Sequence, residues 1–323
     1  MKDASIAIGE KAVTASVPRS QLVAFLVLLA IGLIAPFFVY PIFLAKLLCF
    51  ALFACAFNML IGYVGLLSFG HAAFFGFAAY VSGHAAKVWG FPPEVAIVAG
   101  TAAAALLGLG FGLLAIRRQG IYFAMITLAL AQMLFFFCLQ APFTGGEDGI
   151  QGIPRGVMFG VLPLDDMMTL YFVVLGTFVL GFLIIFRTIY SPFGQVLKAI
   201  RENEPRAISL GYKADQYKLI AFVLSAALSG LAGGTKALVF QLASLTDVHW
   251  TMSGEVVLMT LLGGLGTVFG PVAGAAIIIT MQNYLAQLGG WVTVVQGAIF
   301  VACVLTFRRG VIGELARLLK RPL

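Results

Sequence analysis

The chain has 323 residues, of which 61% are hydrophobic and 10% charged, and its mean hydropathy is +1.04. This much apolar surface does not fit inside a soluble core of that length, so the composition excludes a soluble globular protein and predicts a polytopic membrane protein. The net charge of +7 would suggest a nucleic-acid partner in a soluble protein. Here the positive residues lie at span ends and in one loop, which indicates membrane orientation and no nucleic acid.

The N-terminal residues 1–20 are polar and of mixed charge, unlike the basic start of a cleaved signal, so the first apolar run is predicted to be a retained span. A bilayer core of about 30 Å takes about 20 helical residues. On this basis the fold class is all-α, a polytopic transmembrane helical bundle of about ten spans. The predicted spans are 21–40, 42–62, 66–86, 93–116, 121–140, 168–187, 219–240, 254–269, 271–288 and 290–308.

The distribution of Lys and Arg predicts the orientation of the spans. The stretch between Glu255 and Arg308 has 52 residues without a charge, enough for two spans or for three short ones, and the charge bias favours three. With ten spans, sixteen of the twenty Lys and Arg lie on one side. That side is expected to be the cytoplasm, with both termini on it. Residues 1–20 are then a cytoplasmic segment, 21–308 the membrane domain and 309–323 a cytoplasmic tail.

Two glycine-rich stretches interrupt the hydrophobic pattern. Residues 62–76 contain four glycines and Ser68 as a helix cap, and residues 263–274 contain several glycines with Pro271. Non-helical backbone at membrane depth is tolerated only where it lines a cavity or is buried in protein. The stretches therefore either line the substrate route or its inner gate, or they are sites of close helix packing by small residues.

Polar residues within these spans are candidate contacts for a translocated substrate. His71 can donate to a carboxylate, although a histidine near a span end is more often a structural donor. Thr127 and Gln132 can meet a zwitterion or can join helices. The candidate residues of the translocation path are Ser68, Gly70, His71, Thr127, Gln132, Gly264 and Gly266.

The sequence predicts neither a metal nor a cofactor on this chain. The four cysteines lie in apolar spans without C-x-x-C spacing, and the run Gly230–Lys236 lacks the spacing of a phosphate loop. Residues 144–154 form a turn-rich outer loop without calcium-loop spacing. Its acidic residues Glu147 and Asp148 are either a docking site for a basic patch on an external protein or part of a plain turn.

A basic loop at residues 188–217 separates two long spans. Apolar residues recur at Phe193, Val196, Leu197 and Ile200, which predicts a short amphipathic helix after Pro192. A second helix is expected after a cap at Asn203 or Glu204, with Ala207, Ile208 and Leu210 on its apolar side and Gly211 at its end. The pair suits a cleft in a soluble partner, and the alternative is an amphipathic loop that faces lipid. The candidate docking residues are Val196, Ile200, Arg201, Glu202, Glu204, Arg206, Ala207 and Gly211.

Four parts of the chain resemble one family. The stretches 194–212 with 218–233, 62–76, 120–132 and 262–271 are similar to the membrane subunits of branched-chain amino acid ABC importers, the LivM-type permeases. The resemblance implies a multi-pass protein of a bacterial inner membrane, embedded in its lipid. It also implies four partners of this chain: a second related permease, two ATP-binding cassette subunits that hold the ATP, and an external substrate-binding protein. The docking loop would be the coupling helix, although Pro205 and Arg206 depart from the family's commoner Glu-Ala-Ala start.

The expected function is therefore that of a permease subunit, not an enzyme, in an ATP-driven importer of branched-chain or other apolar amino acids. No ionisable group for proton or sodium coupling is evident deep in the spans, since Lys46, Lys236 and Glu255 lie near outer span ends, where lysines extend to the interface. One alternative is a related ABC permease for urea, short amides or other amino acids. Another is a passive channel for a small neutral solute, which would give the basic loop no function.

Overall fold

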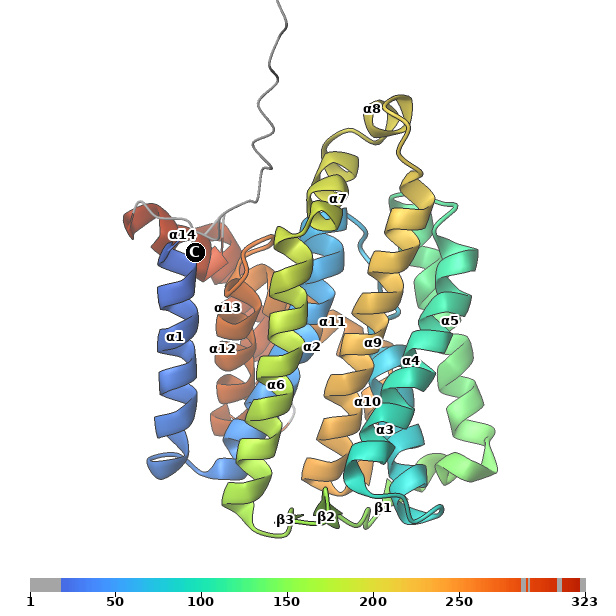
Figure 1. The fold of residues 1–323 in the computed structure, drawn as a ribbon, viewed down its shortest axis with the longest axis vertical. Helices are drawn as coiled ribbons and strands as arrows, with labels where there is room; N and C mark the ends of the chain where they lie inside the picture. Colours follow the sequence, from blue (N-terminus) through green and yellow to red (C-terminus); the bar gives the residue numbers. More distant parts are fainter. Residues whose placement is uncertain (1–18, 286–288, 290, 307–309, 320–323) are drawn as a thin grey trace, which may run out of the picture.

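The fold is a bundle of long helices that run between two ends, one formed by α7 and α8 and the other by the short strands (Figure 1). A computed structural model describes residues 19–285, 289, 291–306 and 310–319. Residues 1–18 of the predicted N-terminal segment, and parts of the predicted spans 271–288 and 290–308 and of the tail 309–323, lie outside these ranges. The α-helices are α1 (Arg19–Ile34), α2 (Pro41–Asn58), α3 (His71–Lys87), α4 (Pro93–Ala115), α5 (Ile121–Gln140), α6 (Met167–Tyr190), α7 (Pro192–Glu202), α8 (Glu204–Ser209), α9 (Ala214–Phe240), α10 (Leu245–Val248), α11 (Trp250–Gly263), α12 (Gly270–Leu285), α13 (Trp291–Thr306) and α14 (Gly310–Leu319).

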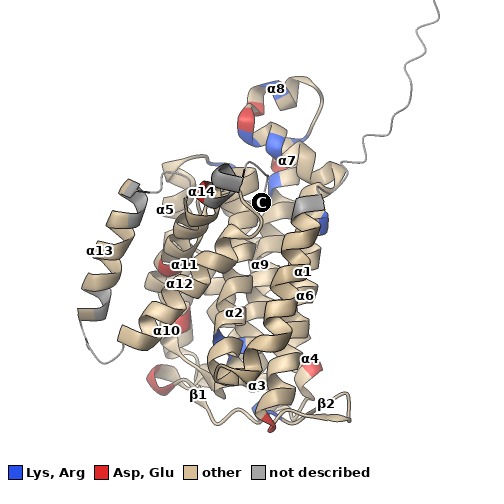
Figure 2. Ribbon diagram, turned by 90° about the vertical axis from the view of Figure 1, so that its left-hand side faces the viewer, with Lys and Arg blue, Asp and Glu red and all other residues tan. Residues whose placement is uncertain are grey.

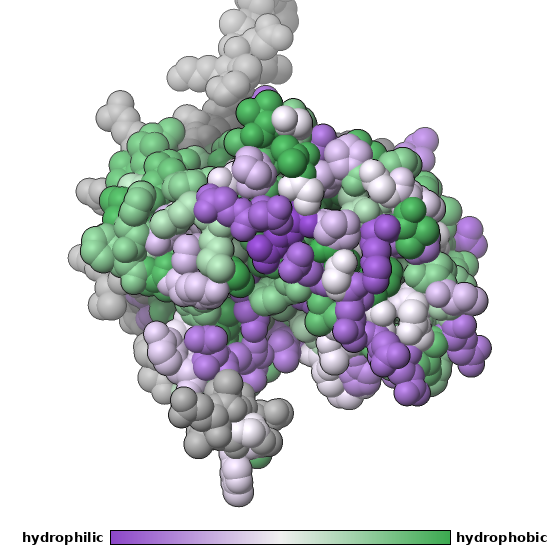
Figure 3. All heavy atoms as spheres, turned by 90° about the horizontal axis from the view of Figure 1, so that it is seen from below, coloured by the Kyte–Doolittle hydropathy of each residue, from purple (hydrophilic) through white to green (hydrophobic). Residues whose placement is uncertain are grey.

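Short elements join the helices. A π-helix, η2 (Met59–Val64), continues α2, and short 3₁₀ turns lie at η1 (Ala35–Phe37), η3 (Pro142–Thr144) and η4 (Gly146–Asp148). The strand β1 (Ile150–Gln151) pairs antiparallel with β4 (Leu242–Ala243), and β2 (Val157–Met158) pairs with β3 (Leu162–Pro163). The prediction of an all-α fold is thus confirmed apart from these two-residue strands. Figure 3 views the strand end and shows hydrophilic residues gathered across it, with a hydrophobic margin on the left.

Each predicted span contains a helix. Among the described residues, five helices are long and apolar enough to cross a membrane, namely α2 with η2, α4, α5, α6 and α9. This supports a multi-pass membrane protein. The helix α3 begins at His71, later than the predicted span start at residue 66, because Gly65 has a left-handed backbone (φ +82°) that ends the preceding helix. The predicted tail contains the helix α14.

Local capping explains where α6 begins. The carboxylate of Asp166 accepts hydrogen bonds from the backbone N–H and the hydroxyl of Thr169, at 2.9 and 2.8 Å. An acidic side chain at this position satisfies N–H groups that the first helical turn leaves unpaired. These bonds, the backbone bond first, hold the pKa of Asp166 below its usual value. The loop from the strand end thus enters α6 at a defined residue.

Small residues bring α3, α4 and α9 into close contact. A Cβ added to Gly233 of α9 would overlap the backbone carbonyl of Phe75 in α3, and one added to Gly230 would overlap Ala104 of α4. Close backbone approach through glycine is the usual packing of helices that lack a hydrophobic driving force between them in lipid. The run Gly230–Lys236 is therefore a helical packing face of α9 and not a phosphate-binding loop.

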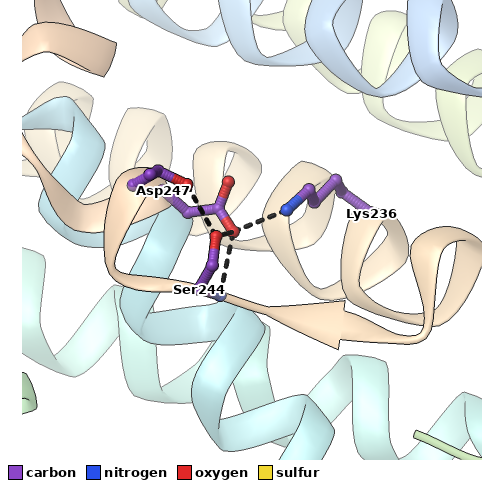
Figure 4. Close-up of polar contacts among 4 residues, drawn as sticks. Lys236, Ser244 and Asp247 are labelled. Carbon is purple, nitrogen blue, oxygen red and sulfur yellow. Dashed lines mark hydrogen bonds and ion pairs between the residues drawn. The ribbon is translucent and has the colours of Figure 1, made fainter. Parts of the chain in front are cut away.

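A buried ion pair joins α9 to α10 near the strand end. The ammonium group of Lys236 lies 2.5 Å from Oδ2 of Asp247, and the two residues are only 8% and 3% exposed (Figure 4). The same oxygen accepts bonds from the N–H and the hydroxyl of Ser244, at 3.3 and 3.2 Å. The expectation that Lys236 extends to the membrane interface is wrong, because Asp247 provides a buried partner for its charge.

Replacing Lys236 with Met should destabilise the fold by about 3–5 kcal/mol, because it leaves the Asp247 carboxylate buried without its counter-ion. Thermal unfolding of the purified chain in detergent measures this cost. The matched control is Lys87→Met, since Lys87 is exposed and donates to the carbonyl of Gln151 at 2.7 Å, with no carboxylate partner among the described residues. Equal unfolding temperatures for Lys236→Met and the wild type would show that the pair does not stabilise the fold.

Candidate functional site at the junction of two interrupted helices

Both predicted helix interruptions are present in the structure. The first follows η2, where Gly65 ends the helix and residues 66–70 are non-helical before α3. The second separates α11 from α12, and there Gly264 and Gly266 have positive φ angles of 124° and 75°. Residues with side chains rarely adopt such angles, so glycine permits the sharp change of direction at each interruption.

The two interruptions contact each other, and we call this contact the junction. The side chain of Asn58 donates from Nδ2 to the carbonyl of Thr267 at 2.8 Å, and its Oδ1 accepts from the N–H of Gly266 at 3.0 Å. A Cβ on Gly62 would lie 2.8 Å from the Gly266 nitrogen, so only glycine fits there. Asn58 and Thr267 are 209 residues apart in the sequence. Asn58 is not among the candidates chosen from the sequence, although a lone Asn inside an apolar span was a signal for it.

Arg201 connects α7 to the junction. Its guanidinium group donates to the carbonyl of Gly62, and a Cβ on Gly65 would lie 3.0 Å from its Cγ. The same guanidinium lies beside Gly266, where a Cβ would be 3.6 Å from Nη1. One side chain of the basic loop thus binds the first interrupted segment and lies beside the second. The start of α14 also packs here, because a Cβ on Gly310 would overlap the Cα of Gly264.

The basic loop is an ordered pair of helices, as its sequence predicts. The hydroxyl of Ser191 caps α7 by accepting from the N–H of Gly194 at 3.3 Å, and Asn203 caps α8 by accepting from the N–H of Arg206 at 3.1 Å. Figure 2 shows charged residues gathered on these two helices. The loop is therefore a pair of capped helices that projects from the bundle (Figure 1).

The candidate docking residues divide into two groups. Ile200 and Ala207 are buried against each other and Ala214, and Glu204 forms an ion pair with Lys218 at 2.6 Å. These three residues hold the loop together. The second group is open to solvent. Val196 in it is half-buried, and the exposed members are Arg201, Glu202, Arg206 and Gly211.

The tip of the loop presents two of the apolar side chains that the sequence predicts on the apolar side of the second helix. Ile208 is 55% exposed and Leu210 is 71% exposed. Gly211 follows them with a φ of +93°, and a groove of about 590 Å³ runs beside Tyr212 and Lys213. The helix α8 has only six residues, and of its apolar residues only Ala207 is buried against the rest of the loop. Ile208 and Leu210 therefore remain available to a partner.

The candidate path residues near the first interruption are buried within the chain. Ser68 accepts a hydrogen bond from the N–H of Gly70 at 3.2 Å, and Thr127 accepts one from the N–H of Phe69 at 3.2 Å. His71 also lies fully buried at the start of α3. In this conformation these side chains hold the start of α3 in place, so their part in the translocation path stays a prediction.

The hydrogen bonds of His71 determine which ring nitrogen carries its proton. The hydroxyl of Ser225 donates its hydrogen to the carbonyl of Ala56 at 2.6 Å, so its oxygen can only accept from Nε2 of His71, at 2.9 Å. The proton of the imidazole is therefore on Nε2. Three aromatic rings surround the imidazole, those of Phe57, Phe74 and Phe222. Gln132 is different, since it is half-buried and its Oε1 has no hydrogen-bond partner among the described residues.

Three polar residues of α2, α11 and α12 gather toward the strand end. Gln282 donates from Nε2 to Oε2 of Glu255 at 3.1 Å. Lys46 and Glu255 interact electrostatically but lie too far apart for an ion pair, and both are half-buried. Within the described residues the ammonium group of Lys46 has no hydrogen-bond acceptor. This zwitterion face (Lys46, Glu255 and Gln282) thus offers a positive and a negative group that remain partly accessible.

The acidic residues Glu147 and Asp148 lie at the opposite end from α8. They form part of η4, next to β1, and both side chains are exposed. The glycines on either side of η4, Gly145 and Gly149, have positive φ angles and fit tightly against neighbouring backbone. The structure therefore presents both carboxylates on a defined surface of the strand end.

Comparison with known proteins places the chain among permeases. A family described as "Branched-chain amino acid transport system / permease component" matches residues 39–304. The high-affinity branched-chain amino acid transport system permease proteins LivM of Salmonella typhimurium and Escherichia coli are each 28% identical, over 283 and 280 residues. The ribose import permease protein RbsC of Bacillus subtilis is 29% identical over 239 residues, which are 69% of this chain and 70% of the relative.

The LivM alignments cover 79% of this chain but only 65% of each relative, so the chain spans about two thirds of their length. No solved structure matches the chain. The family match nevertheless includes both interrupted segments, the basic loop and the zwitterion face. The resemblance seen in the sequence is thereby confirmed, and the chain belongs to the family of branched-chain amino acid transport permeases.

Proposed function

We propose that the chain is the membrane-spanning permease subunit of an ATP-driven importer of branched-chain or similarly apolar amino acids. One observation carries this proposal: Arg201 of the helix pair α7–α8 donates to the carbonyl of Gly62 in the first segment of the junction and lies beside Gly266 in the second. A projection that is built to dock and is connected to interrupted helices suits the transfer of motion from an ATPase. A passive channel would not use it.

The proposed topology places α7, α8 and both termini in the cytoplasm of a bacterium, with ten helices crossing the inner membrane. It agrees with the positive-inside rule, because sixteen of the twenty Lys and Arg then lie on the cytoplasmic side. The strand end, with Glu147 and Asp148, faces outward and meets the external substrate-binding protein. A second related permease completes the membrane part, and two ATP-binding cassette subunits bind at the cytoplasmic side.

The proposed mechanism begins at the tip of the loop. Closure of the ATPase subunits on ATP moves a cleft that holds Ile208 and Leu210, and the capped helices carry this motion to Arg201. Arg201 then pulls on the carbonyl of Gly62 and shifts the contact with Gly266. Gly264 and Gly266, whose φ angles are positive, can change their backbone conformation at little cost, so the second segment bends there and opens or closes the inner gate.

The zwitterion face is the proposed contact for the charged end of the substrate. Lys46 would receive the carboxylate of an amino acid, and Glu255, positioned by Gln282, would receive its ammonium group. Charged residues within membrane-spanning helices are costly and generally face a protein interior or an aqueous path. The candidates Ser68, Gly70, His71, Thr127 and Gln132 are proposed as second contacts of the same route, together with Gly264 and Gly266.

Transport by the assembled complex tests the proposed function. Proteoliposomes that contain this chain, its partner permease and the ATPases, supplied with the binding protein, should accumulate leucine only with ATP. Leucine accumulation without ATP would indicate secondary transport, and simple equilibration would indicate a channel. Ribose is the informative second substrate because RbsC is a similar protein. If ribose, urea or an amide is taken up with ATP and leucine is not, the chain is an ATP-driven permease subunit, but its substrates are not branched-chain amino acids.

Two variants should separate docking from coupling. Leu210→Asp puts a charge into the apolar tip and should reduce the amount of ATPase subunit that copurifies with the permease. Arg201→Gln should leave copurification and ATP hydrolysis intact but lower leucine uptake about tenfold or more, since a charge-assisted hydrogen bond of about 1.5–3 kcal/mol is lost. The control is Arg187→Gln, an exposed cation at the same end. Normal uptake per ATP in Arg201→Gln would exclude Arg201 as the connection.

Lys46→Met should lower leucine uptake about tenfold or more without reducing copurification of the partners, because the substrate carboxylate loses a charged hydrogen-bond donor. Lys87→Met, at the same end of the molecule, is the control. Binding of radiolabelled leucine to the reconstituted complex without binding protein gives a second measurement. If Lys46→Met and the wild type bind and transport leucine equally, Lys46 does not contact the substrate.

A further inference from the structure

A polar cavity of about 610 Å³ lies between the start of α1, the end of α6 and α7, beside the junction. It is separate from the zwitterion face, and although Arg201, Gly62 and Gly266 line it, the proposed mechanism places no ligand in it. Two cationic side chains and one carboxylate face it. The lining residues are Gln21, Gly62, Tyr63, Ile189, Tyr190, Lys198, Arg201, Glu202, Gly266 and Val268.

Lys198 is the best-placed cation of this cavity. Its ammonium group lies 5.6 Å from the ring centre of Tyr63 and 5.8 Å from that of Tyr190. Aromatic faces attract a cation but do not neutralise it. Among the described residues no carboxylate or other hydrogen-bond acceptor contacts this ammonium group. Lys198 is also half-buried, so an anion that enters the cavity meets a partly dehydrated positive charge.

Arg201 adds a second donor to the same cavity. A guanidinium group has five N–H donors in a planar fork, and the carbonyl of Gly62 accepts from one nitrogen. The other donors remain for an anion with several oxygens, such as a phosphate group. Glu202 is exposed and provides the only carboxylate among the lining residues. The lining residues thus include two cations, Lys198 and Arg201, and one carboxylate, Glu202. This excess of positive charge favours an anion in the cavity.

The surroundings of the cavity indicate the source of the anion. Gln21, in its wall, begins the apolar face of α1, where Leu22, Val23 and Leu26 are each more than half exposed. Such a surface suits lipid chains. In the proposed topology, on which this assignment of leaflet rests, the cavity lies at the cytoplasmic leaflet. Basic pockets between membrane helices on that side bind anionic headgroups.

We propose that this cavity binds the phosphate headgroup of an anionic phospholipid, with Lys198 and Arg201 as its ligands and Tyr63 and Tyr190 as its aromatic walls. Arg201 then contacts the lipid and the carbonyl of Gly62 at once. A bound headgroup holds the guanidinium in the position that joins α7 to the junction. The lipid composition of the membrane therefore tunes the connection between the ATPase and the gate.

Lipid binding to the purified chain tests the proposal. Native mass spectrometry of the delipidated chain, titrated with phosphatidylglycerol or with phosphatidylcholine, should show preferred binding of phosphatidylglycerol. Lys198→Gln should weaken that binding about fivefold, and the double variant with Arg201→Gln more, because each cation near the headgroup contributes a similar amount. Lys198→Arg should retain it. Arg187→Gln and Lys213→Gln remove cations of the same end that do not line the cavity, and they should bind as the wild type.

Three results would overturn the proposal. The first is equal binding of the two lipids by the wild type, and the second is unchanged affinity in Lys198→Gln. The third is displacement of the lipid by soluble glycerol phosphate at the same phosphate concentration, which would identify a free phosphate compound as the ligand. The assay needs no partner subunit and no transport. A wild-type complex that accumulates leucine but shows no lipid preference would therefore reject this site and keep the proposed function.

Discussion

The contact between two glycine backbones, held by Asn58, is the constraint on which the rest of this structure depends. Non-helical segments leave N–H and C=O groups without helical partners, and in lipid such groups must be satisfied inside the protein. The amide of Asn58 provides both a donor and an acceptor to Thr267 and Gly266. This arrangement needs glycine at residue 62, and it leaves the carbonyl of Gly62 free to accept from Arg201.

The junction lies at the boundary between two packed groups of helices. One apolar cluster joins α2 with α6, α11 and α12, the other joins α3, α4 and α5, and α9 contributes buried residues to both. Side chains of η2 enter both: Met59 and Tyr63 pack in the first cluster, whereas Leu60 and Val64 pack in the second. A π-helix is rare and marks functional positions more often than chance would give. Its position here, with side chains in both clusters, suits a hinge.

Much of this architecture could be predicted from local patterns, and the rest depends on contacts that no local pattern records. Glycine and proline spacing predicted both interruptions, and amphipathic spacing predicted α7 and α8. Neither pattern shows that the two interruptions meet, that Lys236 finds Asp247, or that Leu210 stays exposed. These outcomes depend on which helix faces are neighbours. Ser68 and Thr127 were candidates because they are polar residues within spans. The sequence does not show that their hydroxyl groups accept hydrogen bonds from the backbone before α3.

The helix α9 explains how one end of the bundle can move while the other stays fixed. Near its start Lys218 holds the basic loop through Glu204, and near its end Lys236 holds α10 through Asp247. Between them its glycines lock α9 to α3 and α4. This block has little freedom, because close backbone packing leaves no room to slide. Motion that enters at the tip of the loop therefore passes through α7. Arg201 carries it from α7 to Gly62 and so to the junction.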